Sequence, residues 1–279
     1  MDMKQRAMDM LRRLEADIAA NRQMLPSLPD VVFRVRALTS SDTCSVAELE
    51  REVARDAAIA ARLMKVANSS LMRRGVPVRS LKQAIACLGF SLVRSMVTQL
   101  AVLQTMNSSG GDSGRLRGFV EGGLHVSALC RSLAGSFPHL DAELAALGGL
   151  LHDIGKLPLR EFLLRQEGLS RIERLRLELM LHPLVGAMML KHWNMADELV
   201  QMARWHESIL RETGDPLPDY VDVVIAANLL HYGTEKGRYA GYAAIEVPAL
   251  RKCTVGRGGQ DDQADTQQRA DLVQAMISD

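Results

Sequence analysis

One stretch in the middle of the chain decides the expected fold: Leu150-Leu151-His152-Asp153-Ile154-Gly155-Lys156. The segment before it predicts a buried helix, because Leu144 and Leu147 extend the leucine pair into a broad apolar face. The His152-Asp153 pair then supplies imidazole nitrogen and carboxylate oxygen, which suit a borderline divalent metal. Gly155 would let the chain turn, and Lys156 would hold a cation for an anionic ligand. A buried hydrogen-bonded pair explains the dipeptide equally well.

Three further histidines fall in helical segments on either side of this pair. His125 lies in an expected helix over 124–133, which would fold back on the pair as a hairpin. His182 precedes Pro183, which fits the first turn of a new helix, and His206 follows on another helix. Metal sites in helical bundles are built from helices that each present a ligand inward. These histidines therefore predict a metal site in a helical core.

The remaining aromatic and basic candidates carry weaker signals. Surface or capping roles are predicted for the histidines that have no ligand-type neighbour at a useful spacing: His139, His192 and His231. Trp193 and Trp205 are expected to anchor the core, since only 4% of the chain is aromatic. A short basic cluster predicts a solvated loop, with an anion or nucleotide site as the less favoured alternative: Arg73, Arg74 and Arg79.

Hydrophobic spacing predicts an all-α chain, because helical periodicity recurs and few segments alternate with period two. The first helix would bury one apolar stripe: Met3, Ala7, Met10, Leu14 and Ile18. Pro26 and Pro29 should end it. Capping boxes are expected where a serine is followed three residues later by glutamate, at Ser45 and Ser170. Ser80 should start another helix that Gly89 breaks.

Two polar stretches predict flexible linkers between packed parts of the chain. Residues 107–114 have the composition of a flexible link, and residues 256–268 have almost nothing to bury. After the second stretch, residues 272–277 would form a short terminal helix with an apolar face. That face is expected to dock on its own chain, with a homodimer contact as the alternative.

Composition excludes some classes of binding partner and indicates the cellular compartment. The 279 residues carry a net charge of +1, which argues against nucleic acid or an anionic membrane as a non-specific partner. The four cysteines form no Cys-x-x-Cys pair, so reduced thiols are expected. The charged N-terminus lacks the apolar core of a signal peptide, and residues 95–111 are too short and polar to span a bilayer. These features predict a soluble cytoplasmic protein.

The order of the histidines resembles the HD superfamily, and the N-terminal half resembles its HDOD branch, the HD-related output domain of bacterial signalling proteins. The motifs that carry this second resemblance are Leu25-Pro26-Ser27-Leu28-Pro29, Leu49 through Asp56, Ala67-Asn68-Ser69-Ser70, and Val78-Arg79-Ser80-Leu81 followed by Ala84-Ile85 and Leu88-Gly89. The resemblance covers about residues 25–233. It implies a two-lobed helical fold, with an N-terminal lobe over 25–107 and an HD-like lobe over 115–233. Residues 1–24 would add an N-terminal helix and residues 234–279 a C-terminal extension.

The resemblance also implies roles for single residues. In HD phosphohydrolases, positions similar to His125, His152 and Asp153 hold one metal together with a later aspartate. Positions similar to His182 and His206 help to hold a second metal. There a metal-activated water attacks a phosphoester, with Asp153 in the catalytic centre and Lys156 steadying the substrate phosphate. The metal could be Fe, Mn, Zn, Mg or Ni, as one ion, two ions or none.

This chain departs from the pattern at the last ligand, where Asn228 stands in place of the aspartate. An amide oxygen can coordinate but brings no charge, so metal affinity should fall. The favoured function is therefore a bacterial regulatory protein that signals through protein contacts, with low or no catalytic activity. The alternative is a divalent-metal phosphohydrolase acting on a nucleotide or cyclic dinucleotide, so a nucleotide or phosphate ligand stays open. Nucleic-acid binding through the basic loop is the least favoured function.

Overall fold

The protein is described by a computed structural model that covers residues 2–20, 29–41, 43–69, 77–108, 113–234, 237–242 and 245–255. All regular elements within these ranges are helices, which confirms the predicted all-α class. In chain order they are α1 (Met3–Ala19), α2 (Asp30–Thr39), α3 (Val46–Val53), α4 (Ala57–Ala67), α5 (Leu81–Leu88), α6 (Phe90–Ser108), α7 (Ser113–Ala134), α8 (Ala142–Leu151), α9 (Lys156–Leu164), α10 (Arg171–His192), α11 (Asp197–Trp205), α12 (Tyr220–Tyr232), the 3₁₀ helix η1 (Gly237–Tyr242) and α13 (Pro248–Val255).

Local sequence fixes several helix ends as expected. Ser45 and Ser170 each accept a hydrogen bond from the backbone of a glutamate three residues on, and each glutamate side chain bonds back to the serine backbone. The Ser80 side chain caps α5 in a similar way through the amide of Gln83. Gly89 ends α5 with a φ of 80°, a conformation that favours glycine. These ends depend on short-range contacts, which is why the sequence reveals them.

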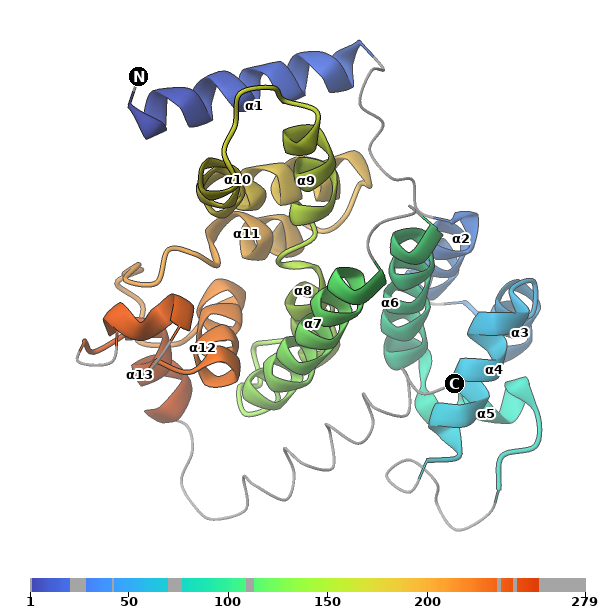
Figure 1. The fold of residues 1–279 in the computed structure, drawn as a ribbon. Coiled ribbons are helices and arrows are strands. Elements are labelled where there is room, and N and C mark those ends of the chain that lie inside the picture. The colour runs from blue at the N-terminus through green and yellow to red at the C-terminus, as the bar shows by residue number, and fades with distance from the viewer. Residues whose placement is uncertain are drawn as a thin grey trace.

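The helices form two groups that share a core (Figure 1). Helices α2 to α6 gather on one side of the molecule, and α7, α8 and α12 pack together beside them. Helix α6 joins the groups because it contacts both α2 and α8. One cluster of buried apolar side chains runs through both groups, from Val31 to Cys253. The boundaries proposed for the two lobes stay a prediction.

Helix α1 lies along the outside of α9 and α10 (Figure 1). Its predicted apolar stripe faces them, with Ala7, Met10 and Leu14 buried in a cluster that includes Phe162 and Leu177. The Arg6 side chain adds an ion pair to Glu173, the capping residue of α10. An amphipathic helix thus covers the outer face of the helix pair that carries His182.

A buried ionic network ties α12 to the segments before and after it. Asp222 is fully buried and accepts hydrogen bonds from Arg211 at 2.8 Å and Lys252 at 3.1 Å. Arg211 also forms a two-bond pair with Asp219, the N-cap of α12. Burying Asp222 is tolerable only because both cations stay beside it.

Some predicted features lie outside the described residues: Pro26, the arginines at 73 and 74, the stretch 256–268 and the terminal helix over 272–277. The flexible link was predicted over residues 107–114, but both ends of that range are helical: α6 continues to Ser108 and α7 begins at Ser113. No single helix in the described ranges is long and apolar enough to cross a membrane, although the bent pair α5 and α6 passes that test together.

Candidate metal centre

Four side chains from two helix ends and one helix interior meet beside α8, α10 and α11. Asp153 follows α8, His182 lies within α10, and His206 and Glu207 follow α11. One ligand atom from each lies within 4.8 Å of every other, and all except Glu207 are buried. We call these four residues the ligand group. Their nitrogen and oxygen donors are of the types that bind borderline divalent metals.

His182 occupies a different place in its helix from the predicted one. The sequence placed it before a new helix starting near Pro183, but α10 runs from Arg171 to His192 with Pro183 inside it. The capping box at Ser170 starts this helix. Proline has no N–H for the carbonyl of Leu179, and Leu179 lies on the exposed side, where water can satisfy that carbonyl. The prediction of a helix start at Pro183 is therefore wrong, and His182 projects from mid-helix.

Backbone carbonyls fix the imidazole orientation in three histidines. The Nδ1 atoms each lie within hydrogen-bond distance of one carbonyl oxygen: His152 to Gly149 at 2.6 Å, His182 to Glu178 at 2.8 Å and His206 to Ala203 at 2.8 Å. A carbonyl only accepts, so Nδ1 must carry the proton in each ring. In the neutral ring Nε2 is then a free lone pair, which is the arrangement that metal-binding histidines use.

The Nε2 atoms of His182 and His206 point toward each other and toward Asp153. Nε2 of His182 lies 3.0 Å from Nε2 of His206 and 3.0 Å from Oδ1 of Asp153. Burial lowers the pKa of His182 to about 4 despite the opposing effect of Asp153, so this ring is neutral at pH 7. Burial likewise lowers the pKa of His152. Two lone pairs and a carboxylate at this spacing call for a cation among them.

Unpaired atoms beside the ligand group lead to the same conclusion. Among the described residues, His152 Nε2 and Asp153 Oδ1 are buried and have no hydrogen-bond partner. The pKa of Asp153 lies well below its usual range although burial opposes this shift, and the Lys156 ammonium pairs with its Oδ2 atom. An ionised buried carboxylate with an unbonded oxygen is costly unless a cation satisfies it. The residues present therefore fit a divalent metal.

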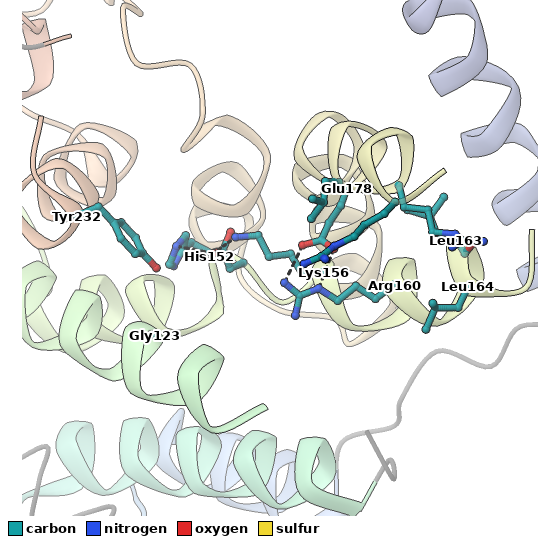
Figure 2. A pocket seen from close by; sticks show the side chains of 12 residues that line it. Gly123, His152, Lys156, Arg160, Leu163, Leu164, Glu178 and Tyr232 are labelled. Atoms are coloured by element: carbon teal, nitrogen blue, oxygen red, sulfur yellow. Dashed lines mark hydrogen bonds and ion pairs between the residues drawn. The ribbon is translucent and has the colours of Figure 1, made fainter. Parts of the chain in front are cut away.

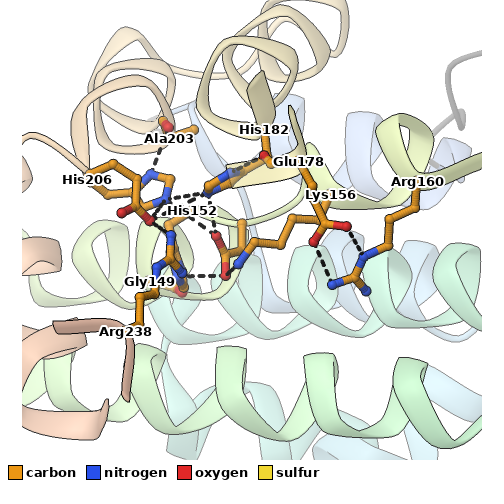
Figure 3. A network of polar contacts seen from close by, with 11 residues as sticks. Gly149, His152, Lys156, Arg160, Glu178, His182, Ala203, His206 and Arg238 are labelled. Atoms are coloured by element: carbon orange, nitrogen blue, oxygen red, sulfur yellow. Dashed lines mark hydrogen bonds and ion pairs between the residues drawn. The ribbon is translucent and has the colours of Figure 1, made fainter. Parts of the chain in front are cut away.

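Two cationic side chains border the ligand group (Figure 3). Lys156 pairs with Oδ2 of Asp153, and burial lowers the pKa of Lys156, with the charge of Arg238 acting in the same direction. Arg238 reaches in from η1 and pairs with Oε1 of Glu207. That same oxygen lies 3.2 Å from Nε2 of His206. Glu207 thus faces the imidazoles and a guanidinium at once.

A cavity of about 560 Å³ extends from the ligand group along α9 and α10 (Figure 2). His152 and Tyr232 lie at one end, and the leucines 163 and 164 lie at the other. The cavity wall also carries four cations and one further carboxylate: Lys156, Arg160, Arg171, Arg174 and Glu178. Glu178 and Arg160 form a two-bond pair at 2.8 Å. The excess of cations suits an anionic ligand.

Comparison with known proteins identifies the family. The family model of the HDOD domain matches residues 25–209. This chain belongs to the HDOD family. No curated protein matches the chain.

Solved structures share the fold of this HDOD protein. A candidate metal-dependent phosphohydrolase from Shewanella amazonensis is 24% identical with a TM-score of 0.73, and the match covers 98% of each chain. An HDOD domain protein of unknown function from Geobacter sulfurreducens is 19% identical with a TM-score of 0.68, covering 99% of each chain. A candidate signal transduction protein from Marinobacter aquaeolei is 20% identical with a TM-score of 0.62, covering 99% of this chain and 66% of that one.

One predicted ligand, His125, lies outside the ligand group of this HDOD domain. His125 is exposed on α7, and its ring stacks on His231 with the centroids 5.4 Å apart. Asn228 is fully buried in α12, and neither atom of its amide has a hydrogen-bond partner among the described residues. His152 borders the group, with Nε2 3.4 Å from Oδ2 of Asp153. The roles assigned to His125 and Asn228 therefore stay predictions.

Sequence reasoning missed two residues of this centre and misplaced a tryptophan. Glu207 follows His206 directly, which repeats the imidazole and carboxylate order of His152-Asp153 and could have signalled a second ligand pair. Arg238 had no such signal, because only the folded chain brings η1 to Glu207. Trp193 is buried as predicted, but Trp205 is 44% exposed and lies beside Arg204. The core role predicted for Trp205 is wrong.

Proposed function

We propose that this HDOD domain is a regulatory module that binds a divalent metal at Asp153, His182, His206 and Glu207, acts through protein contacts, and has little or no hydrolytic turnover. The observation that carries the metal site is the convergence of two Nε2 atoms, from rings whose Nδ1 atoms donate to backbone carbonyls, on one carboxylate oxygen at 3.0 to 3.3 Å. The two imidazoles favour Fe, Zn or Ni over Mg, and the two carboxylates also admit Mn.

The neutral amide at Asn228 supports low turnover. An aspartate at that position would add a charge that holds metal and helps to ionise its bound water, whereas an amide adds none. His125 lies on the surface beside His231, outside the ligand group. A metal held by the remaining residues would supply a Lewis acid and a site for an anion. The Marinobacter relative, described as a candidate signal transduction protein, supports the regulatory role.

Metal content and metal affinity test this proposal. Tag-free protein should retain Mn²⁺ or Zn²⁺ after gel filtration, and His182→Gln should reduce the affinity by about 10- to 100-fold. His192→Gln is a matched control, because this exposed histidine lies on the same helix. If His182→Gln bound metal as tightly as the control, the ligand group would not be the metal site.

The cation-rich cavity favours a second candidate, a phosphohydrolase that acts on a nucleotide or cyclic dinucleotide. Lys156, which pairs with Asp153, and Arg160 both line this cavity, so a phosphate there could meet both the metal and a cation. The Shewanella relative, described as a candidate metal-dependent phosphohydrolase, supports this function. Turnover of a cyclic dinucleotide by Mn²⁺-loaded protein, lost in His152→Ala, would favour it over the regulatory module. Turnover that appears only in Asn228→Asp would favour a site that has lost its activity.

A further inference from the structure

Glu207 lies between the guanidinium of Arg238 and the Nε2 atoms of two histidines. Its Oε1 atom pairs with the guanidinium of Arg238 and also lies 3.2 Å from Nε2 of His206 and 3.6 Å from Nε2 of His182. A metal bound between those nitrogens would need the same oxygen. A guanidinium bonded to a carboxylate withdraws electron density and places a full positive charge beside the metal.

Arg238 is fixed at this place by its neighbour in η1. Tyr239 is 2% exposed and packs in a cluster with Ile225 and Val247, so the backbone of η1 is anchored against α12. The Arg238 guanidinium lies 5.3 Å from the centre of the Tyr239 ring, which supports it from one side. The Arg238 and Glu207 side chains are 23% and 25% exposed, so solvent only partly screens the pair. The contact with Glu207 is therefore held by the packing of η1.

We propose that Arg238 is the residue that sets metal affinity: its guanidinium competes with the metal for Oε1 of Glu207, and so couples the C-terminal segment 237–255 to the ligand group. This inference rests on the proposed metal site. Arg238 and Lys156 approach the group from two sides, so a divalent ion meets two cations there (Figure 3). Coupling of this kind is reciprocal, so metal binding should weaken the hold of Glu207 on η1.

The consequence is a route from surface contacts to the metal. A partner that draws η1 away from α12 would take Arg238 from Glu207 and raise metal affinity. A partner that presses η1 onto α12 would lower it. The competition also explains why Arg238, a charged residue of the C-terminal segment, lies against Glu207 of the ligand group.

A double-mutant cycle on metal affinity tests the competition. The affinity of the full chain for Mn²⁺ is measured from free Mn²⁺ by electron paramagnetic resonance. The variants are Arg238→Gln, Glu207→Gln, the double variant, and the control Arg251→Gln. Arg251 belongs to the same C-terminal segment, but its carboxylate partners Glu212 and Glu246 lie outside the ligand group.

We expect Arg238→Gln to bind Mn²⁺ about tenfold more tightly and Arg251→Gln to match the wild type. In the Glu207→Gln background, Arg238→Gln should change the affinity by less than about twofold, because the competition acts through Glu207. Amide exchange at 238–242 should become faster when Mn²⁺ is added to the wild type.

An equal or weaker affinity in Arg238→Gln would overturn the competition and leave the proposed metal site intact, since Arg238 would then position Glu207 for the metal. A gain of the same size in the Glu207→Gln background would also overturn it. Absence of Mn²⁺ binding in every variant would overturn the proposed metal site and this inference with it.

Discussion

Gly155 in the motif that opened the sequence allows a strong test of how the fold holds the metal centre. A Cβ at this position would lie 2.2 Å from the carbonyl oxygen of His182 and 2.3 Å from the amide nitrogen of Gly186. Both atoms belong to the backbone of α10, so no side chain can rotate away. The φ of Gly155 is −64°, which alanine adopts freely, so the clash is the whole effect of Gly155→Ala.

The size of the effect follows from these distances. Cβ contacts below 3.0 Å essentially never occur, so the start of α9 must move at least 0.8 Å from α10, the difference between 3.0 and 2.2 Å. Overpacking of a tight core costs about 1–3 kcal/mol and more where backbone must move, so we expect a loss of about 3 kcal/mol or more. The same shift would disturb the 3.0 Å approach of His182 to Asp153. Metal affinity should therefore fall by about 10- to 100-fold.

Urea and thermal denaturation measure the loss of stability, and Mn²⁺ titration measures the loss of metal affinity. At about 2–4 °C per kcal/mol for a chain of this order of size, Tm should fall by roughly 6–12 °C. Gly148→Ala is the matched control, because its Cβ would meet the Sδ and Cε atoms of Met202, the movable end of a flexible side chain. We expect the control to lose about 1–2 kcal/mol and to keep its metal affinity. A loss below about 1 kcal/mol in Gly155→Ala, with unchanged Mn²⁺ binding, would refute this account of the close approach.

Three further predictions test other parts of the molecule. With chelator present, the free energy of unfolding should fall by about 3 kcal/mol as the pH drops from 6.5 to 4. The pKa of His182 is about 4 in the folded chain and about 6.5 in the unfolded chain, so the unfolded chain binds more protons in that window. The variant His182→Gln should lose this pH dependence, and an unchanged pH dependence would contradict the assignment. Asp222→Ala should cost about 3–5 kcal/mol because it strands a buried lysine, whereas Asp219→Ala, with a side chain 48% exposed, should cost about 1 kcal/mol; similar losses would argue against the buried network. Leu14→Ala should cost about 2–5 kcal/mol and expose α10 to amide exchange, against less than about 0.5 kcal/mol for Met8→Ala, which is 52% exposed; equal values would mean that α1 does not pack as described.

Short-range signals in the sequence predicted much of the fold. The boxes at Ser45 and Ser170 and the break at Gly89 depend on residues three or four apart, so their chemistry is visible in the sequence. The apolar stripe of α1 follows from helical period alone. Pro183 shows the limit of such signals, since the helix that starts at Ser170 continues through the proline. A local preference for a helix start lost to the hydrogen bonds and packing of a longer helix.

The sequence likewise predicted only part of the metal centre. The sequence indicated the donor types and predicted that His152, Asp153, His182 and His206 belong together. It gave no means to measure distance, so the exposed place of His125 and the approach of Glu207 came only from the fold. Arg238 is separated from Glu207 in sequence by the whole of α12 and the segments on either side of it, and no local pattern relates the two residues.

The sequence by itself determined the helical class and the helix caps, because these depend on periodicity and on contacts within one turn, and its motifs resembled the HDOD family. It also specified a glycine after the His-Asp pair, for which the sequence suggested a turn. The tertiary structure showed why position 155 needs glycine: a Cβ there would lie 2.2 Å from the backbone of α10. It also decided which oxygen Arg238 and a metal would share. Both are long-range distances, and distances between segments far apart in the chain exist only once the core has packed.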